Sequence, residues 1–426
     1  MATALAPRAK TAHHVPLFRM NTVPPNFNAK PFAYHQEITL EIETLTNLGI
    51  GLGRVDGWVV MVAFALPGET VRASVFRNRA NYSEADIVEV LKPSPSRVSP
   101  ECPLFGVCGG CQYQNLAYPE QLLWKERQVR EALARIGGLP DAVVRHTHPS
   151  PRPYHYRAKL TPHYEPPRRD GAFPIGFLRA GSKRALVDVP QCPIATEAVN
   201  AALPKVRADL TAHAAKLKRG GTVLLRETRE GVVTDPGNLV SAEVAGTKFQ
   251  FTAGDFFQNN PFILPELVDY ALAEAAAGGA RNLLDVYCGV GVFALCGRSQ
   301  FEHCLGVEVN ADAVRRAQSN AALNHAANCE FLAGAAEAIF ARAKFPPTET
   351  AVLLDPPRAG CDEPFLRQLL AYGPARIVYV SCDPATQARD LKILVAGSYQ
   401  LHHAQPFDFF PQTRHIECVA TLVKAG

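Results

Sequence analysis

Hydrophobic and polar residues follow three successive patterns along the chain. From about Ile38 to Leu91, short alternating runs are separated by glycine-containing turns, which predicts five short strands closing a small barrel. Apolar residues at helical spacing, ended by a Gly-Gly pair, predict a helix over Pro119–Gly138. After Pro261 apolar strands alternate regularly with helical segments, in the order "RNLLDVY", "HCLGVEV", "NCEFLAG", "AVLLDPP" and "RIVYVSC". This alternation predicts a doubly wound α/β domain.

The region between the barrel and the α/β domain has a mixed pattern. Strand-like pieces near Tyr156–Leu160, Ile175–Leu178 and Leu186–Val189 precede a helix near Ile194–Leu217, which predicts an α+β fold. Residues 1–30 carry basic residues, several prolines and no acidic residue, which predicts a flexible basic arm. We therefore divide the chain into an arm (1–30), a barrel (31–93), a central domain (94–255) and an α/β domain (256–426).

Length and composition indicate a globular protein. The 426 residues are too many for one core, and 47% are hydrophobic and 20% charged. The longest apolar run, Trp58–Leu66, is too short to span a bilayer, and no apolar N-terminal segment resembles a secretory signal. We expect a cytoplasmic monomer that does not bind a membrane.

The net charge of +4 is unevenly distributed. Arg152–Arg184 holds eight Lys or Arg against two acidic residues, interleaved with five Tyr or Phe. Phosphates attract cations, and unstacked bases stack on flat rings, so this composition suits splayed-out nucleic acid. A solvated sheet face would have the same composition, and this alternative stays open.

Ligands of open α/β sheets bind beyond the carboxyl ends of the strands, so the residues that follow each strand are the first candidates for a site. The first strand ends in Asp285 and is followed by Gly289 and Gly291, where a turn can approach a ligand closely. The second strand ends in Glu308, which can accept hydrogen bonds from ribose hydroxyls. Because the full G-x-G-x-x-G of dinucleotide sites is absent, S-adenosylmethionine (SAM) fits better.

Three further residues could carry chemistry at this edge. Asp355 ends the fourth strand and Cys382 the fifth, while Glu417 lies in a strand-like run near the chain end. A thiolate that adds to carbon 6 of uracil activates carbon 5 toward methylation, and a base must then remove the carbon 5 proton. From spacing alone, a packed structural thiol and a structural salt bridge remain alternatives. So does an amine methylase, which would not need the thiol.

Four of the eleven cysteines form a pattern typical of metal ligands, namely Cys102, Cys108, Cys111 and the remote Cys192. Without a secretory signal, such a pattern favours metal or cluster binding over disulfides. Three close thiolates with one remote partner fit a [4Fe-4S] cluster better than a zinc ribbon, although spacing alone leaves zinc open.

Five ordered motifs, "FFQNN", "DVYCGVGVFAL", "DPPRAG", "VSCDPATQARDL" and "RHIECVATL", resemble those of RNA uracil-5-methyltransferases, specifically the RumA-type 23S rRNA enzymes. The resemblance runs from about residue 36 to the chain end. It implies that Cys382 is the nucleophile and Glu417 the base, and that Gln258, Tyr287 and Asp355 line the same SAM and uracil site. It also implies a [4Fe-4S] cluster on the four cysteines.

The segment near residues 36–92 resembles a TRAM domain, an OB-like RNA-binding barrel, on "LPGE" and "ANYSEADIVEVL". Barrel and cluster together imply the 23S rRNA branch, whereas archaeal relatives with clusters methylate tRNA, so a tRNA T-loop uridine is the alternative substrate. A non-catalytic RNA-binding ribosome-assembly factor is a third possibility. Two positions depart from the family pattern, since Val292 and Ala335 stand where relatives carry polar residues.

Overall fold

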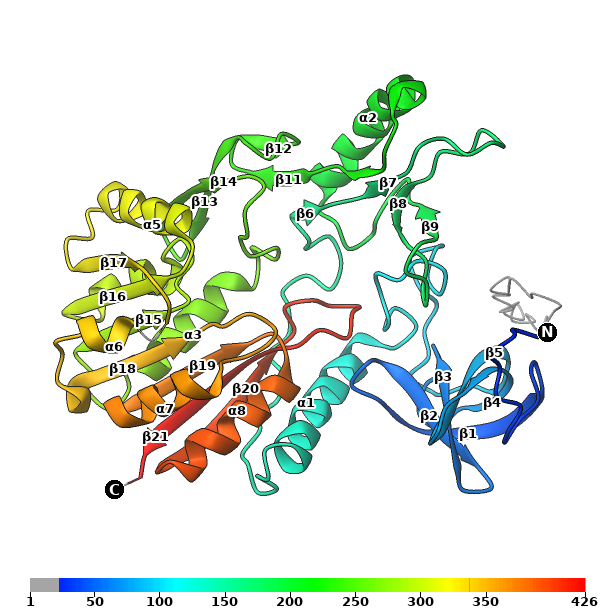
Figure 1. Cartoon of the computed structure of the whole chain (residues 1–426), viewed down its shortest axis with the longest axis horizontal. Coiled ribbons are helices and arrows are strands. Elements are labelled where there is room, and N and C mark those ends of the chain that lie inside the picture. Colours follow the sequence, from blue (N-terminus) through cyan, green and yellow to red (C-terminus); the bar gives the residue numbers. More distant parts are fainter. Residues whose placement is uncertain (1–22, 337, 426) are drawn as a thin grey trace, which may run out of the picture.

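The computed structural model describes residues 23–336 and 338–425, with a barrel, a central region and a C-terminal sheet joined by loops in the middle of the molecule (Figure 1). The predicted arm at 1–30 lies outside the described residues as far as residue 22. No helix in the described ranges is both long and apolar enough to cross a membrane.

The N-terminal strands form the closed barrel that the sequence predicts. The strand order is β1-β2-β3-β5-β4. Every second side chain of the first strand is buried, and Val60, Val62, Val71 and Val75 are fully buried inside the barrel. This alternation is what a small barrel requires, because its inner face is filled by side chains. The strands are β1 (Glu37–Leu45), β2 (Ile50–Val55), β3 (Trp58–Ala63), β4 (Thr70–Asn78) and β5 (Tyr82–Lys92).

The central region is α+β, with small antiparallel sheets and one long helix. Helix α2 (Glu197–His213) begins at Thr196, whose hydroxyl accepts a hydrogen bond from Val199 N, and it continues into a 3-10 turn at Ala214–Lys216. The sheets run in the orders β10-β7-β8-β9, β12-β11-β6 and β13-β14. Their strands are β6 (Lys159–Leu160), β7 (His163–Tyr164), β8 (Ile175–Leu178), β9 (Leu186–Asp188), β10 (Gly221–Thr222), β11 (Leu225–Thr228), β12 (Gly231–Val233), β13 (Leu239–Val244) and β14 (Thr247–Thr252).

The C-terminal part is a doubly wound sheet of seven strands in the order β17-β16-β15-β18-β19-β21-β20, which confirms the predicted fold class. Neighbouring strands are parallel except where β21 pairs with β19 and β20. The strands are β15 (Asn282–Val286), β16 (His303–Glu308), β17 (Cys329–Ala333), β18 (Thr350–Leu354), β19 (Arg376–Ser381), β20 (Tyr399–Phe407) and β21 (Glu417–Lys424). The helices are α3 (Leu264–Ala276), α4 (Val292–Cys296), α5 (Ala311–Leu323), α6 (Ala338–Arg342), α7 (Glu363–Tyr372) and α8 (Pro384–Ala396), with 3-10 turns at Gly297–Ser299 and Pro347–Glu349.

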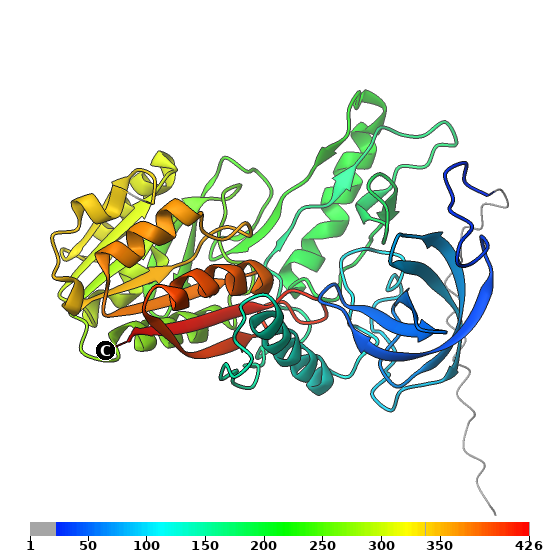
Figure 2. The same ribbon diagram turned by 60° about the horizontal axis from the view of Figure 1, so that its bottom comes forward.

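One helix from before the central sheets packs on the C-terminal sheet. Helix α1 (Tyr118–Arg135) lies beside α8 and β20 (Figures 1 and 2). Its Val129 and Leu133 share a buried core with Leu284 and Tyr379 of the sheet. Although the sequence pattern assigns this helix to the central domain, its apolar face belongs to the core of the α/β domain.

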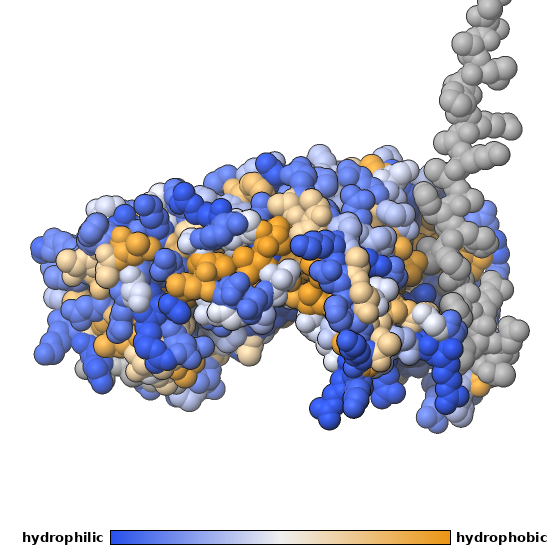
Figure 3. All heavy atoms as spheres, turned by 90° about the horizontal axis from the view of Figure 1, so that it is seen from above, coloured by the Kyte–Doolittle hydropathy of each residue, from blue (hydrophilic) through white to orange (hydrophobic). Residues whose placement is uncertain are grey.

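Viewed from above, apolar surface gathers along the middle of the molecule, between the C-terminal sheet and the barrel (Figure 3). The loops that follow the carboxyl ends of the parallel strands lead toward this middle region (Figure 1). Most of the candidate residues of the SAM and uracil site lie at these strand ends or on the loops that follow them.

Candidate active site

The first strand of the doubly wound sheet leads into a glycine turn. Gly289 and Gly291 both have positive φ angles, of +53° and +89°. A Cβ atom at Gly291 would lie 2.8 Å from the Phe331 ring, whereas a Cβ atom at Gly289 would meet no protein atom within 4 Å. Gly291 is therefore required by the packing of the fold, and Gly289 leaves the backbone open to a ligand.

Glu308 closes the opposite side of this turn. One of its carboxylate oxygens accepts a hydrogen bond from Gly289 N at 3.2 Å, and the other accepts one from Asn310 N at 2.9 Å. The second strand thus holds its terminal carboxylate against the glycine turn, as the sequence predicts for a nucleoside-binding acid.

Two carboxyl groups at this edge have pKa values near neutrality. Burial raises the pKa of Asp285 to about 7, and repulsion from Asp355 and Glu308 adds to the shift. Its Oδ2 accepts a hydrogen bond from Ala294 N at 2.9 Å, but its buried Oδ1 has no hydrogen-bond partner. Burial likewise raises the pKa of Asp355 to about 7. An unpartnered buried oxygen, an open glycine turn and the Glu308 carboxylate beside it together fit a SAM-sized nucleoside.

Cys382 lies immediately after β19, in the bend that leads into α8. Asp383 caps this helix, since its carboxylate accepts hydrogen bonds from Ala385 N and Thr386 N. Pro384 occupies the first helical position, which suits its fixed φ. The half-buried thiol is therefore held between a buried strand and a well-capped helix.

Glu417 is the first residue of β21 and is 6% exposed. Ser381 pairs with Cys418 in the antiparallel ladder between β19 and β21. The next pair of opposed positions beyond it is Cys382 and Glu417, so the structure brings the two predicted catalytic side chains together across one end of the sheet.

The two groups influence each other's protonation. Burial raises the pKa of the Cys382 thiol to about 12, repulsion from Glu417 and Asp355 adds to the rise, and the nearby guanidinium of Arg358 opposes it. Burial holds the pKa of Glu417 well above its ordinary value, with repulsion from Asp355 in the same direction. Like charges so close together favour a proton on at least one of them.

Gln258 and Tyr287 complete the predicted set. Gln258 is half-buried in the loop between β14 and α3, and the neighbouring Asn260 donates a hydrogen bond to Phe409 O at 2.9 Å. Tyr287 follows β15 with a positive φ of +67°, and its ring contacts Phe365 edge-on. The two residues that differ from the family pattern lie at the same end of the sheet. Val292 is the first residue of α4, and Ala335 is exposed after β17.

Three cations gather beside the Gln258 loop. Burial lowers the pKa of Lys159 to about 8, and repulsion from Arg226 and Arg157 contributes. Arg226 is 3% exposed, its guanidinium lies over the Phe251 ring, and its Nε has no hydrogen-bond partner. Next to them Phe256 is 75% exposed. Arg226 is buried, but Lys159 and Arg157 are partly exposed, and these two cations beside an exposed ring fit a phosphate and a base of a polynucleotide.

The four predicted metal-binding cysteines lie together. Cys102, Cys108, Cys111 and Cys192 are free thiols that line one cavity of about 280 Å³. Burial raises the pKa of Cys192 to about 11, and repulsion from the thiolates of Cys102 and Cys108 adds to it. Thiolates that repel one another around a cavity of this size fit a cationic group larger than a single ion.

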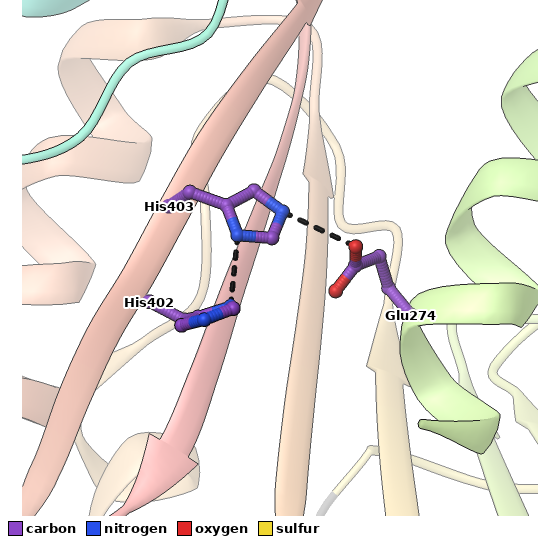
Figure 4. Close-up of side chains that lie close together, drawn as sticks. All are labelled: Glu274, His402 and His403. Carbon is purple, nitrogen blue, oxygen red and sulfur yellow. Dashed lines mark hydrogen bonds and ion pairs between the residues drawn. The ribbon is translucent and has the colours of Figure 1, made fainter. Parts of the chain in front are cut away.

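A second group of metal-ligand residue types, Glu274, His402 and His403, lies where α3 faces β20 (Figure 4). The register shift between Leu401 and His403 places the two imidazoles side by side, with Nδ1 atoms 2.9 Å apart. Arg376 contacts the Glu274 carboxylate at 3.0 Å and Arg145 approaches it at 3.9 Å. Two guanidinium groups already neutralise this carboxylate, so we interpret the group as a polar network joining α3 to β20.

Several residues at the site were not predicted from sequence. Arg358 and Arg226 are two of them. The ion pair between Lys125 and Asp408, both fully buried, could not be predicted either, because its partners are far apart in the sequence. An acidic residue in "FDFFPQ" before a buried strand, and a lysine inside an amphipathic helix, were the available signals.

Comparison with known proteins agrees with this geometry. Residues 223–425 match the family described as tRNA (Uracil-5-)-methyltransferase, and residues 35–88 match the TRAM domain. The chain is 40% identical over 419 residues to the tRNA (uracil(54)-C(5))-methyltransferase of Schizosaccharomyces pombe, covering 92% of this chain and 79% of that protein. It is 32% identical to an uncharacterized RNA methyltransferase of Halalkalibacterium halodurans, covering 92% and 98% of the two chains.

A solved structure shares the fold over most of the molecule. It is that of Pyrococcus abyssi tRNA (uracil-54, C5)-methyltransferase in complex with S-adenosyl-L-homocysteine, with a TM-score of 0.69 and 23% identity, covering 91% of this chain and 100% of that one. The sequence matches, the barrel and the doubly wound sheet lead to one conclusion: the chain belongs to the SAM-dependent RNA uracil-5-methyltransferases, with an N-terminal TRAM domain.

Proposed function

We propose that this protein methylates carbon 5 of a specific uridine in a folded RNA through a covalent adduct with Cys382. The observation that carries the proposal is the opposition of Cys382 and Glu417 across the end of the β19–β21 ladder. A nucleophile and a base at adjacent positions can act on adjacent carbons of one ring. The cations around Lys159 and the exposed Phe256 ring support RNA as the substrate.

In the proposed reaction, the Cys382 thiolate adds to carbon 6 of the uracil and charge develops toward carbon 5. SAM, when bound, supplies the methyl group that carbon 5 acquires. Glu417 then takes the proton from carbon 5, the C5–C6 double bond re-forms, and the thiolate leaves. Arg358 stabilises the thiolate, because it opposes the rise in the Cys382 pKa. Asp355 and Glu308 provide carboxyl groups at the edges of the proposed nucleoside pocket, where they can accept hydrogen bonds from the bound SAM.

For the RNA, two substrates are proposed. The printed names of the Schizosaccharomyces pombe relative and of a 33% identical Saccharomyces cerevisiae relative favour uridine 54 of tRNA. The predicted 23S rRNA substrate is supported by the resemblance to RumA-type enzymes, which combine a TRAM barrel with the four-cysteine pattern. We rank the tRNA T loop first, because named relatives at this level of identity weigh more than a shared accessory domain.

Mass spectrometry separates the two substrates. Full-length protein is incubated with methyl-deuterated SAM and either tRNA or 23S rRNA transcripts, and nuclease fragments are searched for labelled 5-methyluridine. Label at tRNA position 54 alone supports the first substrate, and label in a 23S fragment alone supports the second. Absence of label in both RNAs contradicts the proposed function, provided that SAM binding is measured in the same preparation.

We also propose that Cys102, Cys108, Cys111 and Cys192 hold a [4Fe-4S] cluster. The shared cavity and the mutual repulsion of the thiolates support it. When bound, such a cluster would join the loop around Cys111 to the segment around Cys192 and so stiffen the central domain. Anaerobically purified protein should contain about four iron and four sulfide per chain. Zinc without sulfide would contradict the cluster and leave the methyltransferase proposal intact.

A further inference from the structure

The loop between β20 and β21 delivers Glu417 to the site, and it is anchored from several directions. Lys125 forms an ion pair with Asp408 and donates a hydrogen bond to Phe410 O at 3.1 Å. The Tyr156 hydroxyl donates to Pro411 O at 2.9 Å. These anchors come from the helix α1 and from the central region, so the position of Glu417 depends on parts of the chain far from its own sheet.

Gln412 is the centre of this anchoring. It is 2% exposed and has a positive φ of +67°, which costs about 1 kcal/mol for a residue with a side chain. Its carbonyl oxygen accepts hydrogen bonds from both Gln112 N and Tyr113 N at 3.0 Å. Its backbone N–H and side-chain oxygen both bond to the amide of Gln121, at 3.1 and 3.0 Å. The strained conformation is therefore held by these four hydrogen bonds and by a fifth, from the Gln412 side-chain amide to Pro153 O at 3.4 Å.

The segment that binds Gln412 is the same one that carries a thiol of the cysteine cavity. Gln112 follows Cys111 directly, and its side-chain oxygen accepts a hydrogen bond from Arg414 N at 3.2 Å. Two residues further on, Gln114 accepts a hydrogen bond from Cys102 N at 3.0 Å. From the other side, Thr413 and His415 line the cavity together with the four thiols. The loop before Glu417 is thus one wall of the thiol site.

We propose that Gln112, Gln121 and Gln412 are positioning residues that hold the Glu417 loop in register with the thiol site, so that order at the thiols sets the rate of proton removal by Glu417. This inference rests on the proposed function, because it assigns a step of that reaction. Gln112 follows Cys111 in the chain, so a displacement of Cys111 displaces the backbone N–H of Gln112, which bonds to the carbonyl group of Gln412. Ile416 and Glu417 follow four and five residues after Gln412 and move with it.

Cys382 lies on a different connection, between β19 and the capped α8. This connection is held by bonds between Ser381 and Asp383 and by bonds of Thr386 to Arg358 O and of Gln387 to Cys418 O, and none of them comes from Gln112, Gln121 or Gln412. Loosening the Glu417 loop should therefore slow the removal of the carbon 5 proton far more than the addition of the thiolate, which the loop reaches only through the 3.5 Å contact of His415 with Arg358. The methylated covalent adduct between protein and RNA should then accumulate, which a general loss of folding or of SAM binding would not produce.

The test variant is Gln112→Leu, which removes both the acceptor for Arg414 N and the donor to Gly109 O between the cysteines. The matched control is Gln400→Leu, an exposed position on β20 before the same loop. Each protein is mixed with the RNA and SAM, and the covalent adduct is quantified on denaturing gels beside the rate of 5-methyluridine formation. We expect Gln112→Leu to slow product formation at least tenfold while the adduct fraction rises several-fold, and Gln400→Leu to match wild type.

Two further variants keep the inference testable if Gln112→Leu does not fold. Gln412→Gly retains the carbonyl acceptor and the backbone N–H bond to Gln121 and tolerates the positive φ, but it loses the side-chain bonds to Gln121 and to Pro153 O, so a smaller effect of the same kind is expected. Cys111→Ser, checked for SAM affinity, should also accumulate adduct. Product and adduct falling together in these variants, or neither changing, overturns the inference. Failure of the wild-type protein to methylate any RNA would instead overturn the proposed function.

Discussion

Cys382 and Glu417 occupy opposed positions one step beyond the Ser381–Cys418 pair of the β19–β21 ladder. Opposed positions of antiparallel strands have Cβ atoms about 5 Å apart, a separation close to the reach of a single pyrimidine ring. Both residues extend rigid strands, so their relative position does not depend on a flexible loop alone. The antiparallel strand β21 lies between β19 and β20, and it supplies a carboxyl group beside the thiol that follows the parallel strand β19.

Replacing Cys382 with Ala should abolish methyl transfer, by a factor of about a thousand or more, because no other group could add to carbon 6. SAM affinity, measured by calorimetry, should change less than twofold. The matched control is Cys418→Ala, because Cys418 is fully buried and adjacent to Glu417 but faces the core below the sheet. Full activity of Cys382→Ala would contradict the covalent mechanism.

Glu417→Gln should separate the two halves of the reaction. The amide is nearly the same shape as the carboxyl group but cannot take a proton, so we expect product formation to fall by two to four orders of magnitude, the usual contribution of a general base. The protein should become covalently linked to RNA in a SAM-dependent way, visible as a shifted band on a denaturing gel. A variant that loses turnover without any linked species would assign Glu417 to a structural role.

The pH dependence of thiol alkylation tests the electrostatics of the pair in the absence of RNA. Burial and the Glu417 carboxylate raise the pKa of Cys382, to about 12 in the native site, and Arg358 opposes the rise. Only the thiolate reacts with iodoacetamide, so the alkylation rate should increase with pH toward that value. Glu417→Gln removes a negative charge and should lower the midpoint, whereas Arg358→Gln should raise it. Peptide mass spectrometry isolates Cys382 from the other ten cysteines, and shifts of the same sign in both variants would contradict this electrostatic account.

The sequence predicted those parts of the structure that depend on local pattern. Barrel strands, the order of strands and helices in the α/β domain, and the placement of Asp285, Glu308, Asp355 and Cys382 at strand ends all follow from periodicity and the carboxyl-end rule. Long-range pairing could not be predicted in this way. The packing of α1 on α8 joins segments about 260 residues apart, and an amphipathic helix carries no signal for which surface it will cover.

The hydrogen bonds that join Gln112 and Gln121 to Gln412 could not be predicted from the sequence either. Gln112 and Gln121 look like ordinary surface residues in the sequence, and only the fold brings them to Gln412 near the chain end. The proposed roles of Cys382 and Glu417 came from motif resemblance, and the structure adds their geometry. Cys102, Cys108, Cys111 and Cys192 were grouped by spacing, and they do line one cavity, although the group that they bind stays a prediction.

The two glycines of the cofactor turn should respond differently to the same change. Gly291→Ala places a methyl group 2.8 Å from Phe331 at a φ of +89°, so the fold itself must shift, and we expect a loss of about 2 to 4 kcal/mol in the free energy of unfolding. Gly289→Ala meets no protein atom and should cost only about 1 kcal/mol of backbone strain. Its methyl group instead points into the space left for the nucleoside, so its SAM affinity should fall at least tenfold. Urea unfolding and calorimetry measure the two effects, and equal behaviour of the variants would contradict the proposed placement of SAM.

The ion pair between Lys125 and Asp408 provides a last test, because both side chains are fully buried beneath the Glu417 loop. Lys125→Met leaves the Asp408 carboxylate buried without its cation, which typically costs about 3 to 5 kcal/mol in the free energy of unfolding. Adding Asp408→Asn to this variant removes the unpaired charge and should restore part of that loss, since the penalty comes from the uncompensated charge rather than from a missing contact. Urea unfolding of the wild type, both single variants and the double variant measures the coupling between the two positions. If Lys125→Met stays within about 0.5 kcal/mol of wild type, as surface substitutions usually do, the pair does not anchor the loop that carries Glu417.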